Sequence, residues 1–99
     1  MITQILNFKK TEHFMLRQWE RGIDDRTIRL ALKYVIPNKS QLIVLGKMFF
    51  EKHGLSWSGK FLIIKIIENK LVTIFKRKQS ILNEYITNQR NKQHIKIIA

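Results

Sequence analysis

The chain contains no cysteine, one proline and four glycines among 99 residues. The absence of cysteine excludes a disulfide framework, a thiolate zinc site and a cysteine nucleophile, and it suits a reducing compartment. No apolar run approaches the roughly 20 residues that a membrane-spanning helix requires. The N-terminus also lacks the basic, apolar and small-residue regions of a secretory signal. We therefore expect a cytoplasmic protein without a membrane partner.

Acidic residues are scarce. Seven Asp and Glu stand against 19 Lys and Arg, which gives a formal net charge of +12. This imbalance opposes a compact fold and is most easily explained by a polyanionic partner. Nucleic acid is the first candidate, followed by an anionic membrane and an acidic protein. With 44% hydrophobic residues, the chain has enough apolar side chains for one domain with a single core.

The N-terminal half predicts a strand over residues 2–8 and two helices. Thr11 is placed as the N-cap of a helix over residues 12–21, and Gly22 as its C-terminal stop. We expect its inward side to be formed by Met15, Leu16 and Trp19. A second helix begins at Asp24-Asp25 and ends before Pro37, with an apolar face of Ile28, Ala31, Leu32 and Val35.

The C-terminal half predicts three strands, over residues 42–50, 61–67 and 71–75, and a helix from Ser80 to about Arg90. Glu68-Asn69-Lys70 predicts a tight antiparallel hairpin, because Asn tolerates a positive φ. Residues 51–60 predict a mobile loop that exposes Trp57. The expected fold is α+β, a small antiparallel sheet in the order β-α-α-β-β-β-α, within one domain over residues 1–90. Residues 91–99 form a basic and apolar tail, either a docked strand or a disordered end.

A stripe of His13, Arg17 and Arg21 is the main candidate for chemistry. The three residues are four apart, so a helix places them side by side. Like charges at this spacing weaken a helix, whereas a bound phosphate would reverse the sign of the effect. The alternative is a solvated face on which Arg17 pairs with Glu20 and Arg21 with an aspartate of residues 24–25.

Polar residues also interrupt the apolar faces of the predicted strands. Lys65 falls in line with Ile63 and Ile67, and Lys47 alternates with apolar residues over 43–49. Thr73 lies between Leu71 and Phe75. Such residues either line a site or lie at the rim of the sheet.

The order of elements and the basic composition resemble the RelE-like ribonuclease toxins, of the superfamily that groups barnase, EndoU, colicin-type nucleases and RelE. The local similarity runs from His13 and Arg17 through Glu20-Arg21-Gly22-Ile23, an acidic helix start and Ile28-x-x-Ala31-Leu32. These residues look like the opening of small stand-alone domains of unknown function often assigned to that superfamily. Val72-Thr73-Ile74-Phe75 looks like the closing strand, so the resemblance covers roughly residues 9–78.

The resemblance implies an endoribonuclease toxin that needs no metal and is held by an acidic antitoxin or immunity protein. The RNA 2′-hydroxyl would attack the adjacent phosphate, with His13 as acid or base and Arg17 and Arg21 on the phosphate. Thr73 and Tyr85, the latter either catalytic or part of the core, complete the expected catalytic set. We expect RNA to contact a further set of basic and aromatic residues: Lys47, Trp57, Lys60, Lys65, Lys76, Arg77 and Lys78.

No metal or cofactor is expected. His13, His53 and His94 are far apart in sequence and lack cysteine support for a zinc site. The sequence contains no glycine-rich phosphate loop of nucleotide-binding type and no candidate Ser-His-Asp set. Two alternatives to the ribonuclease remain open: a nucleic-acid-binding protein that does not cut, and an interaction domain that docks on an acidic partner, such as a phage or plasmid accessory protein.

Overall fold

The computed structural model describes residues 4–90 and 92–99 and contains one mixed sheet with helices on both of its faces. The elements are, in chain order, β1 (Gln4–Ile5), β2 (Phe8–Lys10), α1 (Glu12–Glu20), α2 (Asp25–Ala31), the 3₁₀ turn η1 (Leu32–Tyr34), β3 (Gln41–Leu45), α3 (Lys47–Lys52), β4 (Phe61–Ile67), β5 (Lys70–Arg77), α4 (Gln79–Gln89) and β6 (His94–Ile98). The predicted α+β class with a C-terminal helix is confirmed. None of these helices is long and apolar enough to cross a membrane, among the residues that the structure describes.

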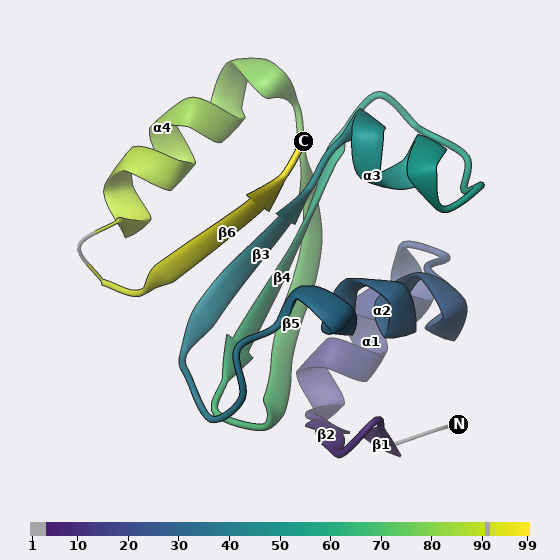
Figure 1. The fold of residues 1–99 in the computed structure, drawn as a ribbon, viewed down its shortest axis with the longest axis vertical. Helices are drawn as coiled ribbons and strands as arrows, with labels where there is room; N and C mark the ends of the chain where they lie inside the picture. The colour runs from purple at the N-terminus through teal and green to yellow at the C-terminus, as the bar shows by residue number, and fades with distance from the viewer. Residues whose placement is uncertain (1–3, 91) are drawn as a thin grey trace.

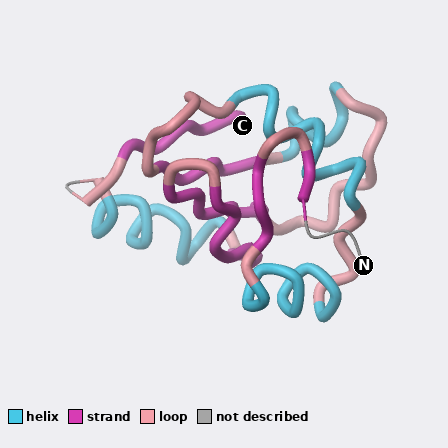
Figure 2. Tube along the Cα trace, turned by 90° about the horizontal axis from the view of Figure 1, so that it is seen from below, coloured by secondary structure: helices cyan, strands magenta, loops and turns pink. Residues whose placement is uncertain are grey.

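The sheet has the strand order β1-β2-β5-β4-β3-β6. Its centre is the predicted antiparallel hairpin β4–β5, and β3 pairs antiparallel with β4. Two pairings are parallel, β2 with β5 and β3 with β6, so the sheet is mixed and not purely antiparallel. Figures 1 and 2 show α4 on one side of the sheet and α1, α2 and α3 on the other.

Each face of the sheet has its own hydrophobic core because side chains alternate along a strand. On the side of α1 to α3, Phe14 and Ile28 pack against Ile64 and Ile74. On the side of α4, Ile63 packs with Leu82 and Ile86, and Phe75 and Tyr85 border the cluster. Residues of β4, and those of β5 from Thr73 onward, can therefore be assigned to a face by alternation, whereas an irregularity in the pairing interrupts it between Leu71 and Thr73.

Helix α1 begins and ends where the sequence predicts. The Thr11 hydroxyl accepts a hydrogen bond from the Phe14 N–H (3.1 Å), and Gly22 follows the helix with a φ of +62°. The predicted inward side is wrong, because Trp19 is 74% exposed and Leu16 is 52% exposed, whereas Phe14 is fully buried. A nine-residue helix with apolar residues on several sides carries no unambiguous face signal.

Helix α2 begins where the sequence predicts but ends early, at Ala31, and Val35 lies beyond η1 in extended backbone. The Asp24 carboxylate caps it by accepting from the Thr27 N–H (2.9 Å) and from the Thr27 hydroxyl (2.7 Å). Ile28, Ala31 and Leu32 are buried as expected. After η1, the turn at Pro37 is closed by the buried Gln41. Its side-chain amide accepts a hydrogen bond from the Ile36 N–H and donates one to the Ile36 carbonyl.

The predicted strand over residues 42–50 is wrong in its second half. β3 ends at Leu45, and Lys47 begins α3, so Lys47 is not on a strand face. Gly46 lies between the two elements, and a Cβ atom there would lie 2.7 Å from the Phe61 ring and 2.8 Å from the Ala99 carbonyl oxygen. Only glycine allows the chain to turn out of the sheet at this crowded point.

The segment over residues 51–60 is not a free loop with an exposed tryptophan. Glu51 and Lys52 belong to α3, and Trp57 is partly buried against the core on the side of α1 to α3. Its ring centroid lies 5.5 Å from that of Phe50 and 5.6 Å from that of Phe61. Aromatic contacts of this kind give Trp57 a packing role that the sequence did not indicate.

The C-terminal half also tests the predictions for the hairpin turn, the start of the last helix and the tail. The β4–β5 turn is tight, but the residue with a positive φ is Glu68 (+55°) and not Asn69. Helix α4 begins at Gln79 and not at Ser80, and the Lys78 side chain makes no capping hydrogen bond. The tail is a docked strand, β6, which pairs parallel with β3, while Asn91 lies outside the described residues.

A buried ion pair fixes α1 and α2 to the sheet. Lys10 is only 3% exposed, and its Nζ lies 2.5 Å from Asp25 Oδ1. Gln18 of α1 donates to the same oxygen (2.8 Å). Burial raises the pKa of Asp25, but the hydrogen bonds from Lys10 and Gln18 outweigh it and hold that pKa below its usual value. One carboxylate thus joins β2, α1 and α2.

We expect Asp25→Ala to lower the free energy of unfolding by about 3 kcal/mol, because it leaves the buried Lys10 ammonium without its carboxylate. The matched control is Glu20→Ala, which removes the exposed partner of Arg17 (2.9 Å) and should cost at most about 1 kcal/mol. Denaturation with urea measures both values. Equal losses for the two variants would show that the buried pair is no more important than a surface pair.

Acid should destabilise the fold through Asp24 and Asp25. Hydrogen bonds from the Thr27 side chain and backbone lower the pKa of Asp24, and the pKa of Asp25 is lowered as well. Because both folded-state pKa values lie below the ordinary 3.8, the stability they provide is complete above that pH. It is lost as the pH falls through the lower folded values. Unfolding free energies measured from about pH 5 to pH 2 should fall less steeply for Asp24→Asn/Asp25→Asn than for the wild type, and equal slopes would contradict this.

Candidate active site

His13 and Thr73 are the two predicted catalytic residues that the structure brings into contact. His13 Nε2 lies 3.1 Å from Thr73 Oγ1, from the first turn of α1 to the middle of β5. Thr73 is the cross-strand neighbour of Lys65, next to the pair Ile63 and Phe75. By alternation, Thr73 and Lys65 therefore lie on the α4 side of the sheet.

The contact forms at an edge of β5 that no strand covers. β2 pairs with β5 only at Lys70 and Leu71, and among the described residues no strand continues along that side. Thr11 continues the hydrogen bonding to β5 after the end of β2. Its backbone N–H donates to the Leu71 carbonyl (3.0 Å) and its hydroxyl to the Val72 carbonyl (3.0 Å). The same hydroxyl caps α1, so His13 is held beside the edge from which it reaches Thr73.

The two arginines of the predicted stripe are held differently. Arg17, one turn after His13, donates to Glu20 (2.9 Å) with both side chains about 40% exposed, as the alternative reading of the stripe expected. Arg21 is exposed at the C-terminal end of α1. Asp24 and Asp25 are engaged with Thr27 and Lys10, and no ion pair of Arg21 is found among the described residues.

A second group of predicted residues meets on the same face, toward α4. The guanidinium carbon of Arg77 lies 4.5 Å from the centre of the Phe75 ring, and Tyr85 of α4 packs edge-on against that ring at 5.4 Å. Burial raises the pKa of Tyr85, opposed by the nearby Arg77 charge. The phenol is therefore a neutral proton donor across the physiological range.

The remaining predicted RNA contacts do not all join this surface. Lys76 is the partner of Leu62 and so points to the opposite face, where it lines a cavity of about 340 Å³ beside Gly22 and Asp24. Lys47 pairs with Glu51 on α3 (3.7 Å). Lys60 and Lys78 are exposed at the end of the sheet where Phe61 pairs with Arg77, and Trp57 is packed as described above.

The sequence did not indicate two features near the site. One is the burial of Lys10, since nothing distinguishes it from its exposed neighbour Lys9. The other is Trp19, 74% exposed, which with Met15, Ile23 and Lys10 lines a cavity of about 420 Å³ beside α1. No group of three His, Asp or Glu residues in the described parts of the chain could hold a metal ion.

The arrangement offers a proton-transfer group held by a hydroxyl, with cations and a neutral phenol on nearby elements. Where Thr73 accepts from Nε2–H of His13, the ring nitrogen Nδ1 keeps its lone pair and can take a proton. Comparison of the chain with family models, with curated proteins and with solved structures found no match, so its chemistry is inferred from these residues.

Proposed function

We propose that this protein is a metal-independent endoribonuclease toxin that acts in the cytoplasm and is neutralised by an acidic antitoxin or immunity partner. The observation that supports this best is the His13–Thr73 contact at the open edge of β5, one helical turn from Arg17. The net charge of +12 supports a polyanionic substrate.

In the proposed reaction, His13 takes the proton of an RNA 2′-hydroxyl. The 2′-oxygen then forms a bond to the adjacent phosphorus while the bond to the 5′-oxygen breaks. Arg17 and Arg21 stabilise the charge that develops on the phosphate oxygens. The leaving 5′-oxygen requires a proton, and Tyr85, whose raised pKa keeps it protonated, is the candidate donor.

Thr73 is assigned as a positioning residue, because it touches His13 and need not touch RNA. Lys65 and Arg77, on the same face, are assigned to the RNA backbone. Arg17 must leave Glu20 to hold a phosphate, and an exposed pair of this kind contributes at most about 1 kcal/mol. A phosphate can therefore replace Glu20 at little cost.

The alternative is a non-enzymatic nucleic-acid-binding or protein-interaction module, which the basic surface alone would serve. Incubation of the purified protein with total RNA in EDTA distinguishes the two. New ends that carry a cyclic or 3′-phosphate support cleavage through the 2′-hydroxyl. RNA that is bound but intact supports the binding module.

His13→Ala should slow cleavage by about a hundredfold or more and leave RNA affinity nearly unchanged, because it removes proton transfer and no phosphate contact. Thr73→Val should lower kcat by a smaller factor without a change in KM, since valine keeps the shape and loses the hydroxyl. His94→Ala on β6 is the matched histidine control. Normal cleavage by His13→Ala, with unfolding temperatures equal to wild type, would move the catalytic role elsewhere.

The structure alters which tryptophan is suited to stack on a base. Trp57 contact with RNA was expected from its loop, but its ring is packed between Phe50 and Phe61, whereas Trp19 is 74% exposed. We expect Trp19→Ala to weaken binding of single-stranded RNA by about 1–3 kcal/mol and to abolish most of the fluorescence quenching on binding. Trp57→Phe, the control, should leave both intact. Quenching that persists in Trp19→Ala and disappears in Trp57→Phe would restore the original expectation.

A further inference from the structure

The sheet ends at β6, whose outer side carries no partner. β6 is the last strand in the sheet order and pairs only with β3, within the described residues. The Gly46 N–H donates to the Ile98 carbonyl (2.7 Å), so the backbone groups of Ile98 face β3. Because these groups alternate along a strand, those of Ile95 and Ile97 point away from the sheet. We call this side of β6, at Ile95 and Ile97, the β6 edge.

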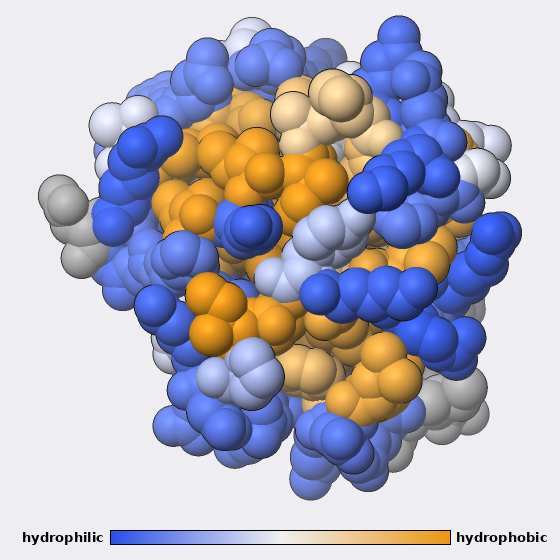
Figure 3. Space-filling view, viewed as in Figure 1, coloured by the Kyte–Doolittle hydropathy of each residue, from blue (hydrophilic) through white to orange (hydrophobic). Residues whose placement is uncertain are grey.

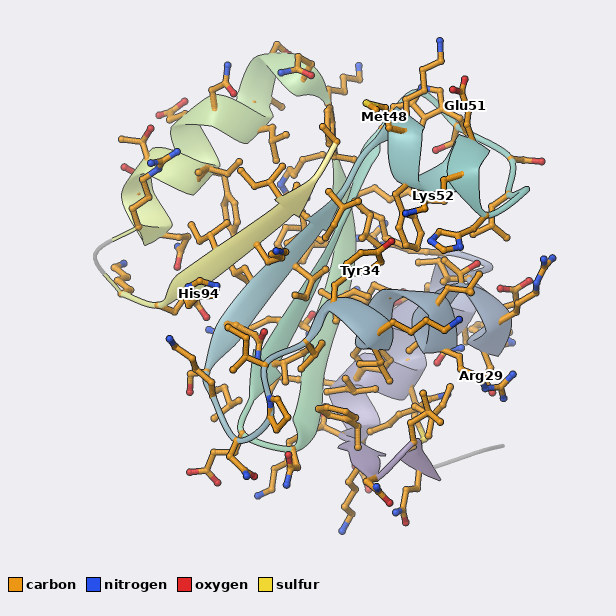
Figure 4. The ribbon with its side chains drawn as sticks, in the orientation of Figure 1. Arg29, Tyr34, Met48, Glu51, Lys52 and His94 are labelled. Atoms are coloured by element: carbon orange, nitrogen blue, oxygen red, sulfur yellow. The ribbon has the colours of Figure 1, made fainter. Side chains whose placement is uncertain are left out.

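Apolar surface surrounds the β6 edge. Ile97 is 44% exposed and Met48, at the start of α3, is 70% exposed. In the space-filling view, an apolar area extends over the C-terminal half of β6 and the start of α3 (Figure 3). Figure 4 places Met48 near the end of β6 and His94 at its beginning, on this same side of the molecule.

A cavity of about 320 Å³ lies beside the strand and has a mixed lining. Its walls come from the end of α4 and from β6: Arg90, Gln93, His94, Ile95 and Ile97. The two isoleucines suit an apolar side chain, and the guanidinium of Arg90 suits a carboxylate. A strand added to the β6 edge would place alternate side chains over this cavity.

The charged residues of the segment that carries the β6 edge have one sign. Residues 90–99 include Arg90, Lys92 and Lys96 and no Asp or Glu. Lys92 and Lys96 are exposed. A lysine on an edge strand disfavours pairing between copies of the same chain, and a net charge of +12 on each copy opposes it further. The same lysine attracts a strand that carries carboxylates.

We infer that the β6 edge is a docking site for an extended segment of a partner chain in which acidic and apolar residues alternate. The segment adds a strand to the sheet, with its backbone bonded to Ile95 and Ile97. Its apolar side chains cover Ile97 and the cavity, and its carboxylates, on the opposite face of the added strand, lie on the side of Lys96. This inference takes from the proposed function only the acidic partner, and it does not require RNA cleavage.

The test uses the full chain and two labelled heptapeptides of alternating sequence, one of Val and Glu and one of Val and Lys. Fluorescence anisotropy should detect binding of the Val-Glu peptide and at least about tenfold weaker binding of the Val-Lys peptide. Amide hydrogen exchange should slow at Ile95 and Ile97 when the Val-Glu peptide is present. Equal affinity for both peptides, or no binding of either, would overturn the inference.

Two variants separate backbone pairing from apolar contact. Ile97→Pro removes an N–H that faces outward and leaves the hydrogen bonds to β3 in place. It should therefore weaken binding of the Val-Glu peptide by about tenfold or more. Ile97→Ala keeps that N–H and should weaken binding by a smaller factor. Unchanged affinity in Ile97→Pro would exclude strand addition at this edge.

A third measurement stands if Ile97→Pro does not fold. Two further Val-Glu peptides are methylated on backbone nitrogens, one at the odd positions and the other at the even positions. Only the peptide whose methyl groups replace the N–H groups that face β6 should bind more weakly, by at least about tenfold. Equal affinity of the two methylated peptides would contradict strand addition. The wild-type protein is assayed for RNA cleavage in parallel, so a protein that binds the peptide without cutting RNA would refute the ribonuclease and keep the docking site. The converse result would do the opposite.

Discussion

The buried pair of Lys10 and Asp25 is the interaction on which the position of the candidate site depends. The ammonium of a lysine that is only 3% exposed is tolerated only when its charge and its hydrogen bonds are satisfied. Asp25 supplies the charge, and Gln18 steadies the carboxylate from α1. Since Lys10 is the last residue of β2 and Thr11 caps the next helix, the pair determines where α1 begins relative to β5. His13 then lies beside the uncovered edge of β5, within reach of Thr73.

Local signals predicted where α1 and α2 begin and where α1 ends. Thr11, Gly22 and Asp24 each act on backbone groups within a few residues, so their effects can be read from the sequence alone. The buried side of α1 could not be read in this way. Met15, Leu16 and Trp19 outnumber Phe14, yet packing against β5 selects Phe14 and leaves Trp19 in solvent.

Long-range contacts explain the larger errors. Residues 42–50 have the composition of one strand, but β3 ends at Leu45 and α3 begins at Lys47, and Phe61 and Ala99 approach Gly46 between them too closely for a side chain. β6 is parallel to β3, and its partner lies about fifty residues earlier in the chain, which no local pattern can indicate. The displacement of Lys47 from the sheet follows from the same turn. The packing of Trp57 depends on Phe50 and Phe61, which the fold brings together from either side of its loop.

Within the candidate site, the sequence predicted which sheet face some residues share but not which residues are in contact. Alternation along β4 and β5 placed Lys65 with Ile63, and the registry adds Thr73 to the same face. The meeting of His13 with Thr73 needed the path from β2 through Thr11, because the two residues lie 60 positions apart. Lys76, Arg77 and Lys78 were all expected to contact RNA, yet strand alternation sends Lys76 and Arg77 to opposite faces.

Few of the basic residues are held in ion pairs. Three ion pairs occupy Lys10, Arg17 and Lys47, so sixteen of the 19 basic residues form no ion pair within the part of the chain that the structure describes. The Lys10 pair is buried and cannot be given up without unfolding, whereas the Arg17 pair is exposed and weak. A polyanion would therefore leave the scaffold of β2, α1 and α2 intact and exchange only with surface partners. Under the proposed function that surface partner is Glu20, which pairs with Arg17 one turn from His13 and which an RNA phosphate would replace.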